Sequence, residues 1–331
     1  MIASISAATF ERFGKPAEVI GINRLELPDP KPNEVLVKTR MAPINPADLN
    51  VLEGTYAVLP DSFPAVAGIE SVGVIAKKGV AVPELKTEQM VICPLRQGTW
   101  CDAFVVPHQQ LVPVPPGIPV DQAAMLSINP PTAWRMLHDF VHLKPGDWII
   151  QNAANSAVGR HVIQIAKHKF IKTVSVVRRP ELVDELKAEG GDVVVVHDEN
   201  LRGKVWEATG DAKIMLGLNA TGGRIMSDMV KCLAQSATLV TYGAMAKEPF
   251  RLNNGAIIFK DIRARGFWIT NWYRNARGTD VKEMFSDIAN LAKTGVIKTP
   301  IEARYSLADV VQAVEHAERE SRSGKILLEI G

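Results

Sequence analysis

The residues Gln151-Asn152-Ala153-Ala154-Asn155-Ser156-Ala157-Val158-Gly159 join an apolar run, 147–152, to an amphipathic segment, 158–168. The run is typical of a buried strand, and the segment has the spacing of a helix. Aligned to the dinucleotide-binding pattern G-x-G-x-x-G, the three glycine places hold Ala154, Ser156 and Gly159. Small residues there let a backbone approach a pyrophosphate at a helix N-terminus. An ordinary strand-to-helix turn is the alternative, because only one of the three places is glycine.

The residues that follow repeat the order of strand and helix. Short apolar strands are predicted at 173–177, 192–196, 213–219 and 238–242, and helices at 181–189 and 224–233. Strands this short and apolar, with helices between them, are typical of a parallel sheet that is covered on both faces. We therefore predict an α/β chain with a doubly wound, Rossmann-type sheet.

The rest of the chain has a different character. Strands are predicted at 34–40, 73–76, 89–92 and 103–106, among prolines that exclude long helices. A helix over 123–137 follows, interrupted near Pro130-Pro131, and helices at 280–294 and 307–322 precede a last strand at 325–330. We predict a mostly β catalytic domain over 1–122, a nucleotide-binding domain over 123–270, and a tail over 271–331 that returns to the first domain.

Two arginines stand at the end of the second strand of the α/β half, in Val177-Arg178-Arg179. Dinucleotide folds place an acid here to bind the ribose 2′-hydroxyl of NAD, or an arginine to accommodate the 2′-phosphate of NADP. Two arginines and no acid at this position indicate NADPH, because a guanidinium pairs bidentately with phosphate. A solvated basic loop is the alternative.

Composition limits the other classes of function. The chain has 331 residues, 47% of them apolar, and a net charge of +2. This balance gives no support for a nucleic-acid partner. Three cysteines without C-x-x-C spacing favour a reducing compartment over a disulfide framework. No apolar run is long enough to span a membrane, and the first ten residues alternate like a strand and do not resemble a secretion signal.

Motifs of other enzyme classes are absent from the sequence. It contains neither the nucleophile elbow G-x-S-x-G nor the P-loop pattern, so hydrolase and NTPase functions have no support. His138 and His142 are four residues apart and could share a metal ion. No third ligand stands nearby, so we predict no metal site.

These features resemble the medium-chain dehydrogenase/reductase superfamily over essentially the whole chain. Its zinc alcohol dehydrogenases carry a cysteine ligand where this chain has Asn45, and a histidine where it has Ile69 before Glu70. Both ligands are lost, which implies the zinc-independent branch. There the chain resembles the trans-2-enoyl-thioester reductases of the mitochondrial type. The matching segments are 42–50, 54–56, 151–159, 240–247 and 259–268, of which the last three are more specific to these reductases.

The resemblance implies a GroES-like catalytic domain, NADPH as cofactor and an enoyl-CoA or enoyl-ACP substrate. It also implies a homodimer. Tyr56 matches the catalytic tyrosine. The implied cofactor-binding residues are Asn129, Asn155, Ser156, Ala157, Val158, Arg178, Arg179, Tyr242, Gly243, Ala244, Met245, Phe267, Trp268, Ile269 and Lys325. Because the family's transit segment has no counterpart in this sequence, we expect a bacterial, cytoplasmic version.

Reduction of an enoyl thioester requires orientation more than reactive groups. Hydride adds to Cβ, charge builds on the thioester oxygen, and Cα takes a proton that a tyrosine can supply. Tyr56 follows Gly54-Thr55 in a predicted turn, and a packing tyrosine is the alternative interpretation. Four aromatic residues could line an acyl pocket or lie in the core: Trp100, Phe267, Trp268 and Trp272.

Two other functions stay open on the sequence. An NADPH:quinone oxidoreductase shares the fold and the cofactor, and the first two matching segments also occur, loosely, in that class. A crystallin-like or RNA-binding protein that keeps the fold without catalysis is the second alternative. The near-neutral charge disfavours RNA.

Overall fold

Two units make up the chain in the computed structural model, which describes residues 3–82, 84–94, 98–249 and 251–331. Unit 1 contains the residues up to Ile128, together with Tyr273–Lys293 and Lys298–Gly331. Unit 2 contains Asn129–Trp272 and Thr294–Ile297. Each unit is described by itself below.

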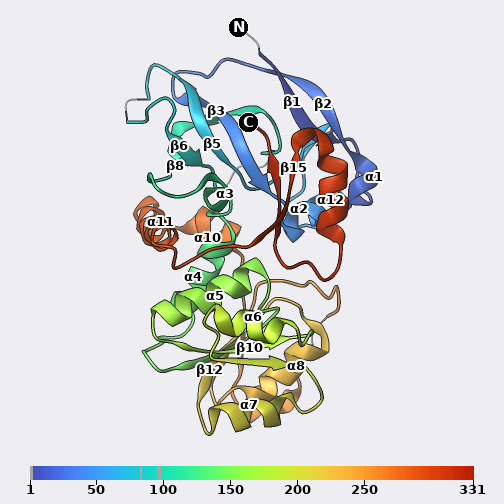
Figure 1. Cartoon of the computed structure of the whole chain (residues 1–331), viewed down its shortest axis with the longest axis vertical. Coiled ribbons are helices and arrows are strands. Elements are labelled where there is room, and N and C mark those ends of the chain that lie inside the picture. The colour runs from blue at the N-terminus through green and yellow to red at the C-terminus, as the bar shows by residue number, and fades with distance from the viewer. Residues whose placement is uncertain (1–2, 83, 95–97, 250) are drawn as a thin grey trace. The chain divides into compact units, whose positions relative to one another are not determined.

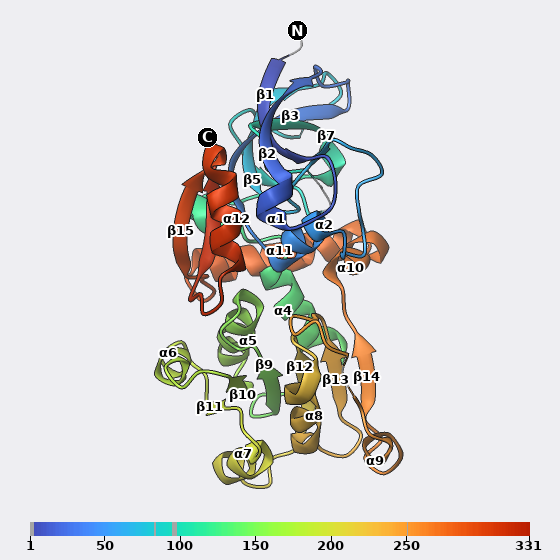
Figure 2. The same cartoon turned by 90° about the vertical axis from the view of Figure 1, so that its right-hand side faces the viewer.

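Unit 2 is built on six parallel strands in the order β11-β10-β9-β12-β13-β14. The strands are β9 Trp148–Asn152, β10 Lys172–Val177, β11 Val193–Val196, β12 Ile214–Asn219, β13 Thr238–Thr241 and β14 Arg263–Gly266. Figure 2 shows β9, β12, β13 and β14 side by side. The strand order reverses between β9 and β12, and open α/β sheets bind their ligands at the carboxyl ends of strands at such a point.

Helices cover both faces of this sheet (Figure 1). Helices α5 Ala157–His168 and α6 Leu182–Ala188 lie on one face, and α7 Leu201–Thr209 and α8 Gly223–Cys232 lie on the other. Strand alternation explains the division, because Val174 and Val176 pack with α7 and α8 whereas Val177 packs with α5 and α6. The predicted doubly wound sheet is confirmed.

Two helices differ from their predicted bounds. The segment predicted as one interrupted helix forms α3 Val120–Ala123 and α4 Asn129–Asp139. Pro130-Pro131 lie in the first turn of α4, where backbone N–H groups have no partner inside the helix, so these prolines begin the helix and do not interrupt it. Near the C-terminus, α12 Val310–Glu318 is shorter than predicted and follows the 3-10 turn Leu307–Asp309.

Unit 1 contains two sheets. The smaller has the order β2-β1-β4, and the larger has the order β15-β16-β3-β5-β6-β8, with β7 also paired to β3. The bounds are β1 Ala3–Phe10, β2 Ile20–Leu27, β3 Glu34–Pro43, β4 Ala65–Val66, β5 Val72–Lys78, β6 Met90–Ile92, β7 Ala103–Pro107, β8 Val112–Pro113, β15 Ile301–Ser306 and β16 Lys325–Glu329. Strand β16 pairs antiparallel with β3, so the end of the chain extends the sheet of the N-terminal segment.

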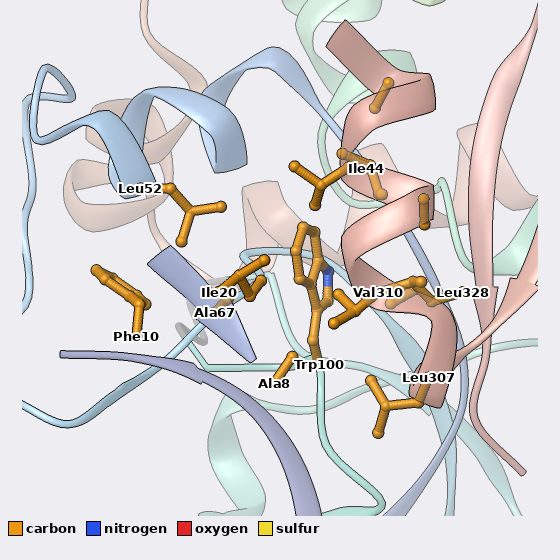
Figure 3. Close-up of a cluster of buried hydrophobic side chains, with 14 of the residues drawn as sticks. Ala8, Phe10, Ile20, Ile44, Leu52, Ala67, Trp100, Leu307, Val310 and Leu328 are labelled. Carbon is orange, nitrogen blue, oxygen red and sulfur yellow. The ribbon is translucent and has the colours of Figure 1, made fainter. Parts of the chain in front are cut away.

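One core of unit 1 surrounds Trp100 (Figure 3). The indole is fully buried among side chains that include Ile20, Ile44 and Val310. A Cβ on Gly68 would lie 2.2 Å from its Cδ1 atom, so only glycine fits there. Trp100 is therefore a core residue and does not line an acyl pocket. The remaining elements are α1 Pro16–Val19, α2 Pro46–Glu53, the 3-10 turn His108–Gln110, α9 Asn254–Ile258, α10 Ile269–Asn275 and α11 Gly278–Lys293.

Candidate functional site

The loop between β9 and α5 has the geometry of a phosphate-binding turn. Ser156 is the N-cap of α5, and its hydroxyl accepts a hydrogen bond from the Gly159 N–H at 3.1 Å. Ala157 and Val158 form the first turn, where backbone N–H groups precede the helix's own hydrogen bonds. The four consecutive residues Asn155 to Val158 that sequence analysis selected thus surround one helix N-terminus, which attracts anions.

Gly159 is required by the close approach of this loop to the helix. A Cβ at Gly159 would lie 2.6 Å from the Ala154 carbonyl oxygen and 2.7 Å from that of Ala153.

We expect Gly159→Ala to push the loop outward, raise the Kd for NADPH at least tenfold, and lower the free energy of unfolding by about 1–3 kcal/mol. Gly278→Ala is the control, since nothing lies within 4 Å of its Cβ position. Isothermal titration and denaturant unfolding measure both quantities, and equal Kd values for the two variants would contradict the prediction.

A second loop meets the first at the end of β13. The Tyr242 hydroxyl is buried beside the Ser156 hydroxyl, and among the described residues it makes no well-formed hydrogen bond. Burial raises the pKa of Tyr242 above its usual range, and the Ser156 hydroxyl opposes the rise. The next residue, Gly243, has no room for a Cβ, which would lie 2.6 Å from the Ala220 carbonyl oxygen. The loop continues through the exposed Ala244 to Met245, whose N–H bonds the same carbonyl at 3.2 Å.

A buried amide network that sequence analysis missed joins these loops at the carboxyl ends of the central strands. Asn152 at the end of β9 donates to Asn219 Oδ1 at 2.8 Å, and its own oxygen accepts from the Ala220 N–H at 2.7 Å. Asn219 ends β12 and donates to the Thr241 hydroxyl at 3.1 Å. The network fixes three adjacent strand ends where the strand order reverses. An asparagine at the end of each of two strands was the signal available in the sequence.

The two arginines lie at the carboxyl end of β10, next to β9. Arg178 is exposed, whereas Arg179 is partly buried and forms an ion pair with Glu181 at 3.3 Å. An exposed guanidinium beside a helix N-terminus can take a phosphate in bidentate fashion. Arg178 is therefore better placed than Arg179 to bind a 2′-phosphate.

The remaining residues selected in unit 2 lie at its two ends in sequence. Asn129 is buried and begins α4. Phe267 follows β14, with its N–H bonded to the Thr241 carbonyl at 2.9 Å and its ring packed edge-on against Phe140. Trp268 is partly buried, and Ile269 begins α10 as a core residue. The structure thus brings the segment 267–269 next to the end of β13, where Tyr242 also lies.

Tyr56 lies in unit 1, just beyond the end of α2. Gly54 takes the left-handed conformation that ends the helix, with φ at 78°. The Tyr56 N–H then bonds back to the Asn50 carbonyl at 3.2 Å. Its ring is half-buried against the Trp100 core. The backbone of this tyrosine is therefore held firmly, while part of the side chain is open to solvent.

A buried polar cluster also lies in unit 1, and it includes Lys325. Lys325 is 7% exposed and its ammonium donates to Asn45 Oδ1, and the Asn45 amide donates to Glu70 at 2.9 Å. The other Glu70 oxygen accepts from Ser127 N–H and hydroxyl and from Ile128 N–H, at 2.9 to 3.0 Å. This carboxylate thus holds the segment that leads into α4. Sequence analysis missed its role because Glu70 appeared only as a neighbour of Ile69.

Burial shifts the ionisation of this cluster. Desolvation lowers the pKa of Lys325 to about 8, and the nearby Glu70 and Asp48 carboxylates oppose the shift. Desolvation raises the pKa of Asp48 to about 7, and it raises that of Glu70 as well. Lys325 is therefore tied into unit 1 by charge and hydrogen bonds. The cofactor contact implied for it by resemblance stays a prediction.

The donor set of this cluster does not fit a tetrahedral zinc site. Asn45 uses its amide for Glu70 and Lys325, and Ile69 offers no side-chain donor. Across the described ranges, no group of three or more His, Cys, Asp or Glu side chains could hold a metal ion. Zinc prefers thiolate and imidazole ligands, and neither is present at these two positions.

The loop between β9 and α5 in unit 2, in contrast, fits the dinucleotide cofactor that the sequence predicts. Gly159 and Gly243 let the backbone pack closely against the carbonyls of Ala154 and Ala220, and among the described residues the buried Tyr242 hydroxyl makes no well-formed hydrogen bond. A buried hydroxyl of this kind is costly unless a ligand or water pairs with it. These observations fit a dinucleotide phosphate at the N-terminus of α5.

Comparisons with known proteins show which family the chain resembles. Residues 31–116 match the alcohol dehydrogenase GroES-like domain, and residues 157–289 match the zinc-binding dehydrogenase family. The mitochondrial enoyl-[acyl-carrier-protein] reductase of Rattus norvegicus is 40% identical over 94% of this chain and 85% of that protein. The reductase of the same name from Homo sapiens is 38% identical over 98% of this chain and 89% of that protein.

Solved structures resemble the chain over its whole length. A putative NADPH:quinone reductase from Bacillus thuringiensis has a TM-score of 0.91 and 26% identity, covering 99% of both chains. A complex of Etr1p with NADP and crotonyl-CoA has a TM-score of 0.88 and 26% identity, covering 99% of this chain and 100% of that one. A 2-enoyl thioester reductase heterodimer from Candida tropicalis has a TM-score of 0.88 and 27% identity, with the same coverage.

The location of the protein stays a prediction. The relatives named above are mitochondrial proteins, whereas the sequence predicts a cytoplasmic one. In the part of the chain that the structure describes, no helix is both long and apolar enough to cross a membrane.

Proposed function

The chain belongs to the family of mitochondrial enoyl-[acyl-carrier-protein] reductases, and from this we propose that it reduces the 2,3 double bond of trans-2-enoyl thioesters with NADPH. The phosphate loop at the N-terminus of α5, with Arg178 at the end of the next strand, is the observation that carries the proposal. The substrate is an enoyl-CoA or an enoyl-ACP. The quinone reductase alternative is supported by fold similarity at 26% identity, which is weaker support than a relative at 40%.

The residues of unit 2 hold the cofactor by its phosphates and its nicotinamide end. Asn155, Ser156, Ala157 and Val158 would hold the pyrophosphate, and Arg178 would bind the 2′-phosphate, with Arg179 in a lesser role because Glu181 competes for it. We assign to the nicotinamide end the residues Asn129, Tyr242, Gly243, Ala244, Met245, Phe267, Trp268 and Ile269. When bound, NADPH supplies the hydride that adds to the substrate Cβ.

Tyr56 completes the reduction by moving a proton. As the Cβ–H bond forms, the π electrons of the double bond shift toward the thioester and leave negative charge on its oxygen. The Tyr56 hydroxyl donates a proton to Cα, or orients a water that does, and solvent then restores the phenol. The hydrogen bond from the Tyr56 N–H to Asn50 fixes the backbone from which the hydroxyl reaches the substrate.

We also propose that the reaction is independent of zinc. Asn45 and Ile69 supply no thiolate or imidazole at the positions where the zinc alcohol dehydrogenases carry ligands. The charge that develops on the thioester oxygen must then be met by hydrogen-bond donors.

The assay that tests the function follows NADPH oxidation at 340 nm with crotonyl-CoA, longer trans-2-enoyl-CoA substrates and a quinone, each in the presence of a metal chelator. We expect rapid turnover of the thioesters, much slower turnover with NADH, and no loss on chelation. Quinone turnover without thioester turnover would assign the chain to the quinone reductases. Loss of activity on chelation would overturn zinc independence alone.

A homodimer formed through β14 is part of this proposal. β14 is the last strand of its sheet, all four of its residues are exposed, and Ile258 and Phe259 just before it are 68% and 77% exposed. An unpaired edge beside apolar side chains favours pairing with β14 of a second copy about a twofold axis.

We expect light scattering to give a dimer for the native chain, and a monomer for the double variant Ile258→Asp with Phe259→Asp. Phe170→Asp, at another exposed aromatic residue, is the control. A monomeric native chain would contradict the proposal.

A further inference from the structure

Arg160 is an arginine buried in the interior of unit 2. It lies in the fourth position of α5, directly after Gly159, and its side chain is 1% exposed. Its Nε donates to the Asn155 carbonyl at 3.1 Å, Nη2 donates to Glu185 at 2.6 Å, and Nη1 contacts Glu189. Every nitrogen of the guanidinium therefore has a partner. The two glutamates belong to α6 and its C-cap, and the carbonyl belongs to the cofactor loop.

Burying a guanidinium costs desolvation free energy. An ion pair in the interior gains little over well-packed apolar residues, because desolvation of the charges offsets their attraction. The packing of α5 against α6 therefore does not by itself account for an arginine here. Of the three contacts of the guanidinium, only the hydrogen bond to the Asn155 carbonyl reaches the cofactor loop.

That hydrogen bond fixes one peptide plane of the cofactor loop. On one side of the plane, the Asn155 carbonyl accepts from Arg160, and on the other the Ser156 N–H donates to the Ala153 carbonyl at 2.9 Å. Because both polar groups are engaged, the peptide between Asn155 and Ser156 cannot rotate freely. Ser156 is the N-cap of α5, so its backbone orientation sets the direction of the first N–H groups of the helix.

We propose that Arg160 is a positioning residue for the cofactor. It holds the cofactor loop, between β9 and α5, in the conformation that binds the phosphates. Glu185 and Glu189 act through Arg160 by anchoring its guanidinium to α6. That helix begins just after Arg178 and Arg179, so the same ion pairs connect the pyrophosphate loop to the loop at the end of β10. The proposal rests on the proposed function only in taking NADPH as the ligand.

The loop has a positive charge nearby, on Arg160, and two negative charges, on Glu185 and Glu189. The negative charges allow the proposal to be tested separately from a simple electrostatic effect. Neutralising the two glutamates removes negative charge near an anionic cofactor, which by electrostatics alone would tighten NADPH binding. Positioning predicts the reverse, because Arg160 loses its anchors and the loop loosens. The double variant Glu185→Ala with Glu189→Ala therefore separates the two explanations. These carboxyl side chains are 37% and 23% exposed, so solvent can reach the space they leave.

The experiment titrates NADPH and NADH into the full chain without substrate and follows heat or cofactor fluorescence. We expect Arg160→Met to raise the Kd for both cofactors by a similar factor of about ten, the effect of one hydrogen bond to a charged donor. The double glutamate variant raises both Kd values as well. In steady-state assays, kcat at saturating NADPH stays within twofold of the native value. Arg135→Met, which removes a partly buried arginine paired with Asp139 on α4, is the matched control and leaves both Kd values unchanged.

Each alternative gives a different pattern. Unchanged Kd values with a lowered Tm would show that Arg160 stabilises the fold without positioning the cofactor. A lower Kd in the double glutamate variant would show that charge, and not position, governs binding. If the native chain itself bound neither cofactor, the proposed function would fail, and the role of Arg160 toward NADPH would fail with it.

Discussion

The variant Tyr56→Phe is expected to lower kcat for crotonyl-CoA about 100-fold or more, with the Kd for NADPH unchanged within twofold. Loss of a positioned general acid costs typically 10²- to 10⁴-fold in rate, and phenylalanine removes the hydroxyl while it keeps the ring. The ring is half-buried in the Trp100 core, so the variant retains its packing. Stopped-flow turnover and cofactor titration measure the two quantities.

Tyr305→Phe is the matched control for this experiment. Tyr305 also lies half-buried in unit 1, and its hydroxyl bonds to His316 at 2.9 Å. Removing that hydroxyl deletes a structural hydrogen bond and is expected to leave kcat within twofold. A near-normal kcat for Tyr56→Phe would remove the proton-donor role from Tyr56 and leave it a packing residue.

The second large effect concerns the choice between the two cofactors. Arg178→Ala is expected to raise the KM for NADPH about 10- to 100-fold and that for NADH less than twofold. A hydrogen bond to a charged group contributes about 1.5–3 kcal/mol, and each 1.4 kcal/mol corresponds to a factor of ten. Only NADPH carries the 2′-phosphate that this guanidinium would bind.

Two further arginines provide controls for Arg178. Arg202 is exposed on α7, and Arg202→Ala is expected to change neither KM. Arg179 already pairs with Glu181, so Arg179→Ala is expected to have a smaller effect than Arg178→Ala. If Arg178→Ala raised both KM values equally, the 2′-phosphate assignment would be wrong, and the arginine would act on the pyrophosphate or on the fold.

Most strands of unit 2 could be predicted because their burial leaves a pattern in the sequence. β9, β10 and β13 are short and buried on both faces, as strands in a covered parallel sheet are. β14 was missed for the converse reason. Its residues Arg263-Ala264-Arg265-Gly266 are all exposed at the sheet edge, so burial imposes no apolar pattern on them.

Some residues of the candidate site could likewise be predicted from the sequence, and others could not. The loop Asn155 to Val158 could be predicted because a strand, small residues and a helix follow one another in sequence. Glu70 and Arg160 could not, since their partners lie 57 and 29 residues away, respectively, and only the fold brings them together. Buried charges of this kind leave no periodic signal, and a single sequence does not show which partner each will find.

The measurement that tests the central claim most directly is the position of deuterium in the product. Crotonyl-CoA is reduced in ordinary water with NADPH deuterated at C4, on either face in separate reactions, and the acyl product is analysed by NMR. The account predicts butyryl-CoA that carries deuterium at Cβ from one of the two cofactors, and none at Cα. Deuterium at Cα, or oxidation of NADPH without formation of butyryl-CoA, would contradict the assignment of this chain as an enoyl thioester reductase.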